Sequence, residues 1–160
     1  MEQTQYQMRS KVGPLYLVAA KSGLCSVSFR RQNITLVKEL DVLKPAEKIL
    51  AAIVKQLEEY FSGKRKDFVI SFILTGTVFQ KQVWQELSKI PFGKTVSYRD
   101  IAKKIKNPKA VRAVGSANGK NPFCIIVPCH RVIEADGTIG GYAGGIAMKR
   151  RLLKLEQLCG

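Results

Sequence analysis

The sequence predicts an α/β N-terminal unit followed by a mainly α-helical C-terminal unit. Two observations support this prediction. Short apolar runs separated by turn residues occupy the chain up to Phe29, which is typical of a strand meander. After Thr75, apolar residues recur at helical spacing behind N-capping residues. A chain of 160 residues can form one domain or two small ones without disulfides.

The N-terminal unit is expected to contain three short strands and one helix. The apolar runs from Tyr6 to Phe29 are interrupted by the turn sequences Lys11-Val12-Gly13-Pro14 and Lys21-Ser22-Gly23. Pro45 then opens a helix that Gly63 ends. Its apolar positions share one face and are Ile49, Leu50, Ile53, Val54, Leu57 and Phe61. Residues 68–74 are compatible with a further strand, and we predict a domain boundary between residues 1–74 and 75–160.

Three helix starts are expected next. Thr77 with Gln80, and Ser97 with Asp100, have the spacing of capping boxes. Asn107 followed by Pro108 predicts a third start, because it combines an N-cap side chain with a proline where no amide hydrogen is needed. That helix is expected to run to about Gly119.

The second and third of these helices resemble a helix-turn-helix within a basic segment. Ala110, Val111, Val114 and Ala117 share one face of the later helix, so Lys109, Arg112 and Ser116 should point outward. An outward arginine could contact nucleic acid or could simply be solvated on a small helical bundle. A last helix over residues 148–155, with Lys149, Arg150, Arg151 and Lys154, could likewise be a solvated basic face.

The chain is strongly basic, with a formal net charge of +15. Residues 1–74 carry 12 basic and 7 acidic side chains, whereas residues 75–160 carry 15 and 5. The second part is therefore the better candidate for binding a polyanion. Such a charge attracts phosphates without specifying a sequence or a reaction, and some basic proteins have no nucleic-acid ligand.

The cysteines suggest free thiols rather than disulfides or a zinc site. They are Cys25, Cys124, Cys129 and Cys159, without a Cys-x-x-Cys pair and with His130 as the single histidine. We interpret Cys25 and Cys124 as packed core residues and Cys159 as exposed and inert. The N-terminus lacks signal-peptide character and no apolar run is long enough for a membrane span, so a reducing cytoplasmic setting is expected.

The most informative segment is Ile125-Ile126-Val127-Pro128-Cys129-His130-Arg131-Val132-Ile133. On spacing alone, adjacent cysteine and histidine residues are weak evidence of catalysis, because a buried cysteine is often only a small apolar residue. The segment nevertheless resembles the Pro-Cys-His-Arg active-site motif of the O6-alkylguanine-DNA alkyltransferases. Further motifs stand in family order: Phe79, Gln80, Val83 and Trp84; Ser97-Tyr98; Arg112-Ala113-Val114-Gly115; Asn121-Pro122; Gly140-Gly141-Tyr142-Ala143-Gly144-Gly145; and Leu152-Leu153 up to Glu156.

This resemblance implies a catalytic set. Cys129 would be the nucleophile that takes the alkyl group, with His130 as its base through a bridging water and Glu156 orienting the imidazole. Asn121 would hold the active-site turn, and Tyr98 would donate a hydrogen bond to the departing guanine. The resemblance also implies a substrate pocket formed by Trp84, Tyr142, Ala143 and Val132, with the Ala143 amide near O6.

It further implies a ribonuclease-H-like N-terminal fold and a winged helix-turn-helix that enters the minor groove. Arg112 would fill the space of the flipped nucleotide. The implied DNA-binding residues are Arg112, Ser97, Tyr98, Lys109, Ser116 and Arg131. The expected protein is a monomer that acts once on O6-alkylguanine in double-stranded DNA, without metal, cofactor or membrane. It would work in the cytoplasm, with access to the nucleoid or nucleus. Activity on O4-alkylthymine stays open.

Two other classes of function remain as alternatives. One is a non-enzymatic module of the same fold that recognises alkylated guanine; it would lack the reactive cysteine, so Cys129 argues against it. The other is a thiol hydrolase built on Cys129, His130 and Glu156, which would turn over repeatedly on an ester or amide.

Overall fold

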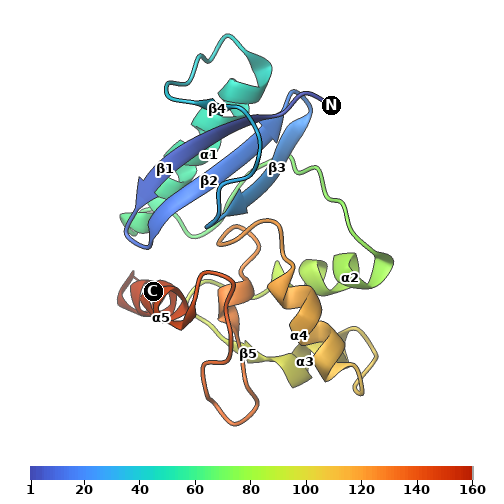
Figure 1. The fold of residues 1–160 in the computed structure, drawn as a ribbon. Coiled ribbons are helices and arrows are strands. Elements are labelled where there is room, and N and C mark those ends of the chain that lie inside the picture. The colour runs from blue at the N-terminus through green and yellow to red at the C-terminus, as the bar shows by residue number, and fades with distance from the viewer. Residues whose placement is uncertain (160) are drawn as a thin grey trace. The chain divides into compact units, whose positions relative to one another are not determined.

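The computed structural model describes residues 1–159, which form two compact units, one from Met1 to Leu74 and one that begins at Thr75. Figure 1 shows a sheet with one helix in the first unit and a group of helices in the second. Each unit is described by itself below. The division falls where the sequence changes from strand patterns to capped helical patterns.

The first unit is a four-stranded sheet in the order β3-β2-β1-β4, with one helix across it (Figure 1). The strands β1 (Thr4–Ser10), β2 (Gly13–Ala20) and β3 (Gly23–Ser28) form the predicted antiparallel meander. The short strand β4 (Leu36–Val37) pairs in parallel with β1 and was not predicted, because two residues carry no recognisable alternation. The helix α1 (Pro45–Phe61) begins at the predicted proline and packs on β1, β2 and β3.

The core of this unit forms where the apolar face of α1 meets the sheet. Leu50, Ile53 and Leu57 of the helix and Leu15 and Leu17 of β2 are buried, as the helical and alternating spacings require. Gly63 lies just after the helix with a φ of 76°, a left-handed conformation that favours glycine.

The segment 68–74 does not form the further strand that its apolar composition allowed. Only Phe72 forms a single bridge to Leu24, supported by hydrogen bonds from the Leu24 amide to the Ser71 carbonyl and from the Ile73 amide to the Leu24 carbonyl. Two backbone hydrogen bonds do not make a ladder, so the segment crosses the edge of β3 as an extended connection.

The second unit is mainly helical. It contains α2 (Val78–Leu87), α3 (Tyr98–Lys104), α4 (Val111–Gly119), a 3-10 turn η1 (Cys129–Arg131) and α5 (Ile146–Cys159). The short strands β5 (Val96–Ser97) and β6 (Val132–Ile133) pair in parallel. The helices α2, α3 and α4 pack on one another. Among residues 1–159, every helix is too short or too polar to span a bilayer.

Two of the three predicted helix starts are confirmed. Thr77 and Gln80 form a capping box at α2, and Ser97 and Asp100 form one at α3. The third start was wrong: α4 begins at Val111, and Asn107 does not cap it. The Asn107 amide instead donates to the Ala102 carbonyl and closes the end of α3, while the Ala110 amide donates to the Asn107 carbonyl in a turn.

Candidate active site

Cys129 lies at the start of η1 and opens onto a cavity of about 400 Å³. The cysteine side chain is only 3% exposed, so the cavity is its main route to a substrate. All lining residues belong to the second unit; they are Tyr98, Val111, Arg112, Gly115, Asn118, Gly119, Cys129, Glu134, Gly141, Tyr142 and Ala143. The site therefore combines residues of α3, α4, η1 and the loop before α5.

A strained turn places the cysteine. Ile125 has a φ of 74°, which is costly for a β-branched residue and must be maintained by its surroundings. Asn121 supplies part of that support: its Nδ2 donates to the Val127 carbonyl at 2.7 Å, and its Oδ1 accepts from the Phe123 amide at 2.9 Å. Asn118 on α4 donates to the Cys129 carbonyl at 3.3 Å. Both asparagines thus bind the backbone of the turn.

Behind the cysteine, His130, Arg131 and Glu156 form a buried hydrogen-bonded cluster. His130 Nε2 lies 2.5 Å from Glu156 Oε2, and Arg131 Nε donates to Glu156 Oε1 at 2.6 Å. Arg131 also donates to the Ile90 carbonyl at 2.7 Å, and its guanidinium lies 5.7 Å from the centre of the Phe92 ring. Glu156 therefore connects α5 to the η1 turn.

The electrostatics of this cluster favour a neutral histidine. Burial lowers the pKa of His130 below its usual 6.5, although Glu156 opposes the shift. Burial raises the pKa of Glu156, but hydrogen bonds and charges from His130 and Arg131 outweigh it and lower the pKa to about 2. The ionised Glu156 carboxylate accepts a hydrogen bond from the Nε2–H of His130. The proton of the neutral imidazole therefore stays on Nε2, and Nδ1 is the unprotonated nitrogen. Nδ1 has no protein partner within residues 1–159, so it is available as a base.

Several neighbours favour the thiolate form of Cys129. A hydrogen bond from the Cys124 side chain is the largest cause of its lowered pKa, followed by one from Asn121 and the charge of Lys149, while burial acts in the opposite direction. A lowered pKa increases the fraction of thiolate, which is the nucleophilic form. Cys124 is buried, as expected for the packed core residue that the sequence predicts.

Lys149 corrects the sequence interpretation of α5. The sequence allows Lys149 to lie on a solvated basic face, but its side chain is fully buried. Its ammonium donates to the Val132 carbonyl at 2.6 Å and the Gly141 carbonyl at 3.1 Å, and it lies 5.8 Å from the Tyr98 ring centre. Its position three residues before Leu152 and seven before Glu156, on one helical face, was the available signal.

Tyr98 lines the cavity as a protonated phenol. Burial, and then the charges of Glu134 and Cys129, raise the pKa of Tyr98 above its usual 10.0, so the hydroxyl keeps its proton and can donate it in a hydrogen bond.

Most of the site residues expected from the sequence lie together in the structure, but three of them lie outside the expected pocket or DNA-binding surface. Cys129, Tyr98, Tyr142, Ala143 and Arg112 line the cavity, and His130, Glu156 and Asn121 support it from behind. Trp84 and Val132, expected in the pocket, are buried outside its lining; the indole N–H donates to the Ala117 carbonyl. Arg131, expected on DNA, is wrong as a DNA contact because its guanidinium is buried on Glu156 and Ile90.

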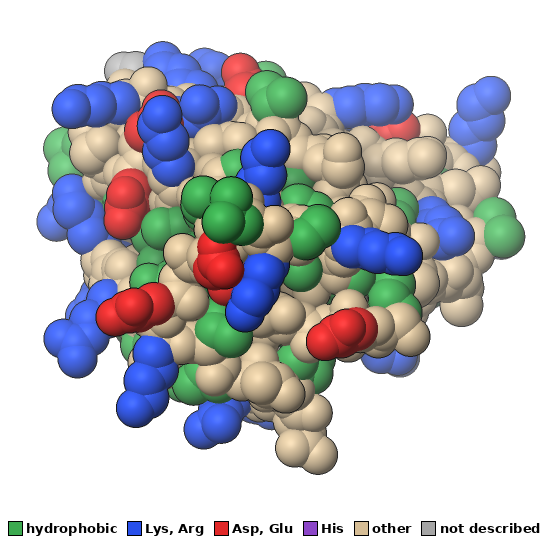
Figure 2. All heavy atoms as spheres, turned by 90° about the horizontal axis from the view of Figure 1, so that it is seen from above, with side chains coloured by type: hydrophobic (Ala, Val, Ile, Leu, Met, Phe, Trp, Pro, Cys, Tyr) green, Lys and Arg blue, Asp and Glu red, His purple; other side chains and the backbone are tan. Residues whose placement is uncertain are grey.

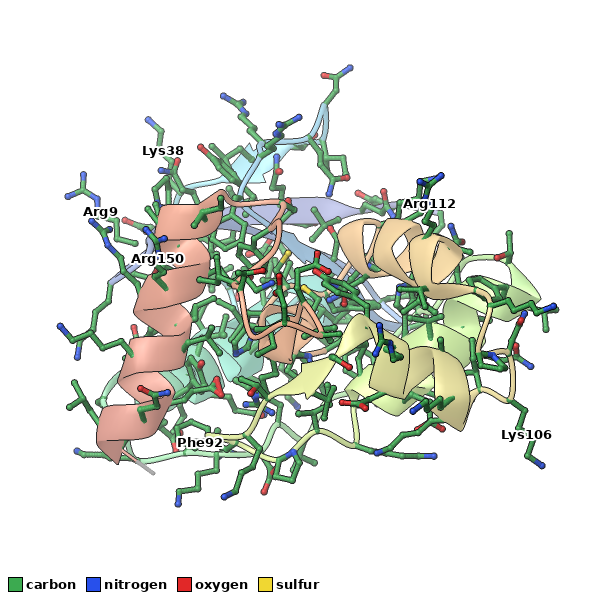
Figure 3. The ribbon with its side chains drawn as sticks, turned by 90° about the horizontal axis from the view of Figure 1, so that it is seen from below. Arg9, Lys38, Phe92, Lys106, Arg112 and Arg150 are labelled. Atoms are coloured by element: carbon green, nitrogen blue, oxygen red, sulfur yellow. The ribbon has the colours of Figure 1, made fainter. Side chains whose placement is uncertain are left out.

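The expected DNA-binding side chains on and beside α4 are exposed: Lys109, Arg112 and Ser116. Figure 3 shows Arg112 projecting outward from α4. Ser97 caps α3 through its hydroxyl. Asn118, Glu134 and Lys149 are site residues that the sequence analysis did not name as such. In the described part of the chain, no three His, Cys, Asp or Glu side chains gather as a metal would require.

An activated cysteine in a cavity beside the exposed arginine of a two-helix motif defines a class of protein: a cysteine-dependent group-transfer protein with a nucleic-acid-binding helix pair. The comparisons give its family. The family model described as the 6-O-methylguanine DNA methyltransferase DNA binding domain matches residues 78–158, and the ribonuclease-like domain of the same family matches residues 5–73. The chain belongs to the 6-O-methylguanine DNA methyltransferase family. The predicted fold class is thereby confirmed.

Known relatives are similar over nearly their whole length. A methylated-DNA–protein-cysteine methyltransferase of Methanosarcina acetivorans is 46% identical over 150 residues, which cover 94% of this chain and 96% of the relative. One from Mycobacterium leprae is 45% identical, with 94% and 90% covered. A crystal structure of Mycobacterium tuberculosis OGT in complex with DNA matches with a TM-score of 0.87 and 41% identity, covering 98% of this chain and 94% of that one.

Proposed function

We propose that this protein repairs O6-alkylguanine in double-stranded DNA by moving the alkyl group irreversibly onto its own Cys129. The observation that carries this proposal is the position of Cys129: a cysteine with a lowered pKa lines the same cavity as Tyr98. The relatives' names agree, since they are methylated-DNA–protein-cysteine methyltransferases.

The reaction is a displacement at the alkyl carbon. The Cys129 thiolate forms the new carbon–sulfur bond as the bond between that carbon and guanine O6 breaks, and the electron pair leaves with guanine. The unpartnered Nδ1 of His130 is the acceptor for the cysteine proton, directly or through one water. The Tyr98 hydroxyl stabilises the departing base by donating a hydrogen bond, and the Ala143 amide lies on the wall of the same cavity.

The product ends the reaction. A thioether sulfur is a poor leaving group, and no side chain that lines the cavity is placed to cleave a carbon–sulfur bond. Each molecule should therefore react once and need no cofactor.

The helix pair supplies the route to the base. A base inside a duplex must leave the stack before it can enter the cavity, at a cost of a few kcal/mol. Arg112 lines the cavity and is exposed, so it can occupy the space that the base leaves. Lys109, Ser116 and Ser97 would contact the DNA nearby. Figure 2 shows Lys and Arg side chains spread over one face of the molecule with acidic side chains among them, and the formal net charge of +15 suits a polyanionic partner.

The two units would have different roles. We assign residues 1–74 to an N-terminal α/β domain and residues 75–160 to the domain that binds DNA and performs the chemistry, since every cavity residue lies there. We further propose that the protein acts as a monomer in the cytoplasm, with access to DNA.

The test is an intact-mass measurement after incubation with a duplex that contains one O6-methylguanine. The wild type should gain one methyl group, about 14 Da, and stop at one equivalent, whereas Cys129→Ala should gain nothing. Binding without a mass gain would favour a recognition module. Repeated turnover would favour a hydrolase-like catalyst. Either result would overturn the proposal.

A further inference from the structure

Glu134 is an acidic side chain in the cavity wall that the proposed reaction does not use. It is the one Asp or Glu among the described residues that line the cavity, which Cys129 and Tyr98 also line. Glu134 is exposed, and within residues 1–159 its carboxylate forms no ion pair with a Lys or Arg side chain. The cavity therefore presents a negative charge to a group that enters it.

The backbone of a tight turn fixes the position of Glu134. Glu134 follows directly after β6; its amide donates to the Thr138 carbonyl at 2.9 Å, and its carbonyl accepts from the Gly137 amide at 3.0 Å. A Cβ at Gly140 would lie 3.4 Å from Glu134 Oε1 and 3.4 Å from the Tyr98 hydroxyl oxygen. Both oxygens therefore lie beside the same glycine, so the carboxylate is close to the hydroxyl that is proposed to bind the departing base.

We infer that Glu134 is a specificity-determining residue that makes the cavity accept neutral alkyl groups in preference to anionic ones. The inference rests on the proposed role of Cys129 as the acceptor of the alkyl group. A cavity of about 400 Å³ gives a bound base and its alkyl group little room to move away from the walls. An alkyl group that ends in a carboxylate would enter beside the like charge of Glu134, and a repulsive charge is a general means of excluding one of two similar ligands.

Two cationic side chains face the same region and limit the size of the effect. Arg112 lines the cavity from α4, and the buried ammonium of Lys149 lies 5.8 Å from the Tyr98 ring centre. Burial lowers the pKa of Lys149 and raises that of Tyr98, and the charge of Glu134 opposes the first shift and adds to the second. Because Glu134 is exposed, solvent weakens its repulsion, and we expect a preference of about five- to tenfold rather than complete exclusion.

The experiment uses two reagents of nearly the same shape that alkylate cysteine: iodoacetamide, which is neutral, and iodoacetate, which is anionic. With either reagent, the Cys129 thiolate forms a carbon–sulfur bond as the carbon–iodine bond breaks, and iodide leaves with the electron pair. Peptide mass gives the rate at Cys129 for each reagent in the full chain. The ratio of the two rates cancels any change in the thiolate fraction, because both reactions need the thiolate. Cys159 is exposed and provides a reference ratio in the same molecule.

Glu134→Gln should raise the rate with iodoacetate, relative to iodoacetamide, about five- to tenfold at Cys129 and leave the ratio at Cys159 unchanged. Salt at about 1 M, where the screening length is about 3 Å, should reduce the difference between the wild type and the variant. Asp136→Asn is the matched control and should keep the wild-type ratio. It removes the same charge from an exposed residue of the same turn that is not among the described residues lining the cavity.

Equal ratios in the wild type and Glu134→Gln would overturn the inference. So would an equal gain in Asp136→Asn, since that result reports the net charge of the protein rather than a charge in the cavity. Neither reagent needs DNA, so this result is independent of the proposed function.

A second measurement compares alkyl transfer from duplexes that contain either O6-methylguanine or O6-carboxymethylguanine. Glu134→Gln should raise the rate for the carboxymethyl lesion, relative to the methyl lesion, by a similar factor. An unchanged ratio, with both lesions reacting, would also overturn the inference. If the two reagents show the effect and neither duplex alkylates Cys129, only the repair proposal fails.

Discussion

Glu156 accepts hydrogen bonds from a histidine and an arginine in a place that water does not reach. Such a cluster is costly to bury and is stable only while every member keeps its partner. The neutral state of His130 and the ionised state of Glu156 both depend on folding, so both make stability depend on pH.

We predict that acid destabilises the protein in two steps. The pKa of His130 is below 6.5 in the folded state, so the unfolded chain takes up the proton first and stability falls as pH drops below about 6.5. The pKa of Glu156 is about 2 when folded and 4.5 otherwise, so a second loss occurs as pH falls from 4.5 towards 2. Urea unfolding over this pH range measures both steps.

Glu156→Gln tests the second step. The variant should lack the second loss of stability below pH 4.5, because it has no carboxyl group to titrate at this position. At neutral pH its free energy of unfolding should fall by about 3–5 kcal/mol, because Arg131 is left buried without a countercharge. Glu86→Gln is the control, since Glu86 pairs with a largely exposed lysine and should cost under about 1 kcal/mol. Equal losses in the two variants would contradict the proposed importance of the cluster.

Lys149→Met gives a second prediction for a single residue. The variant leaves the Val132 and Gly141 carbonyls without their donor, so it should lose about 2 kcal/mol or more of stability. Cys129 should also react more slowly, because a neighbouring positive charge is lost. Arg150→Met is the matched control; Figure 3 shows Arg150 extending away from α5. If Lys149→Met unfolds and is alkylated at Cys129 like Arg150→Met, the buried ammonium of Lys149 supports neither stability nor the reactivity of Cys129, and the prediction fails.

The residues that the sequence indicated are those that the family motif contains. Cys129, His130, Asn121 and Glu156 all lie in one site, but spacing alone could not separate Cys129 from an ordinary buried cysteine. Lys149 was missed because a lysine among other basic residues is usually solvated. The wrong assignment of Arg131 has a similar cause: its charge suggested DNA, whereas its partner Glu156 lies 25 residues away in sequence.

At the scale of elements, α3 ends in a Schellman motif. The Asn107 amide donates to the Ala102 carbonyl, and the Lys106 amide donates to the Lys103 carbonyl. Lys106 occupies the left-handed position with a φ of 59°, where glycine is the usual residue. This ending places Asn107 in the turn that closes α3, three residues before Ala110, which holds the N-cap position of α4.

Lys106→Gly should therefore stabilise the protein by about 0.5–1 kcal/mol, because it relieves the left-handed strain at a small cost in chain entropy. Lys106 is exposed, and Figure 3 shows its side chain extending into solvent, so little packing is lost. Urea unfolding measures the change. Lys104→Gly, within α3, is the control and should destabilise by up to about 1 kcal/mol. A loss of stability in both variants would show that strain at Lys106 is negligible.

The two capping boxes allow a comparison between stability and binding. Thr77→Ala and Ser97→Ala should each cost about 1 kcal/mol, because each removes the acceptor for an amide at the first turn. Only Ser97→Ala should also weaken binding to duplex DNA, since Ser97 is proposed as a DNA contact and Thr77 is not. Thermal melting and fluorescence anisotropy measure the two effects. Equal weakening of DNA binding by both variants would assign the effect to stability alone.

The elements were predictable where a local signal existed. The meander, α1 and the starts of α2 and α3 follow from turn residues, apolar spacing and caps. The strand β4, the parallel pair β5 and β6, and the η1 turn have no such signal, because two or three residues take their conformation from contacts distant in sequence.

At the scale of the whole molecule, the charge of +15 is not evenly distributed. Three exposed groups, Lys109, Arg112 and Ser116, stand together on and beside the α4 helix. If that face binds DNA, a substitution there should change the salt dependence of binding. The same loss of charge on the first unit should matter less.

Duplex binding is predicted to weaken steeply with salt, since each phosphate contact adds about 0.9 to the slope of log affinity against log salt concentration. Lys109→Ala should reduce that slope by about 1. Arg112→Ala should in addition slow methyl transfer, because Arg112 is proposed to replace the extruded base. Lys48→Ala, an exposed lysine on α1, is the matched control and should leave the slope unchanged. Salt titrations of binding to an undamaged duplex measure all three variants. If Lys48→Ala lowers the slope as much as Lys109→Ala, attraction by total charge explains the binding and the α4 face is not its site.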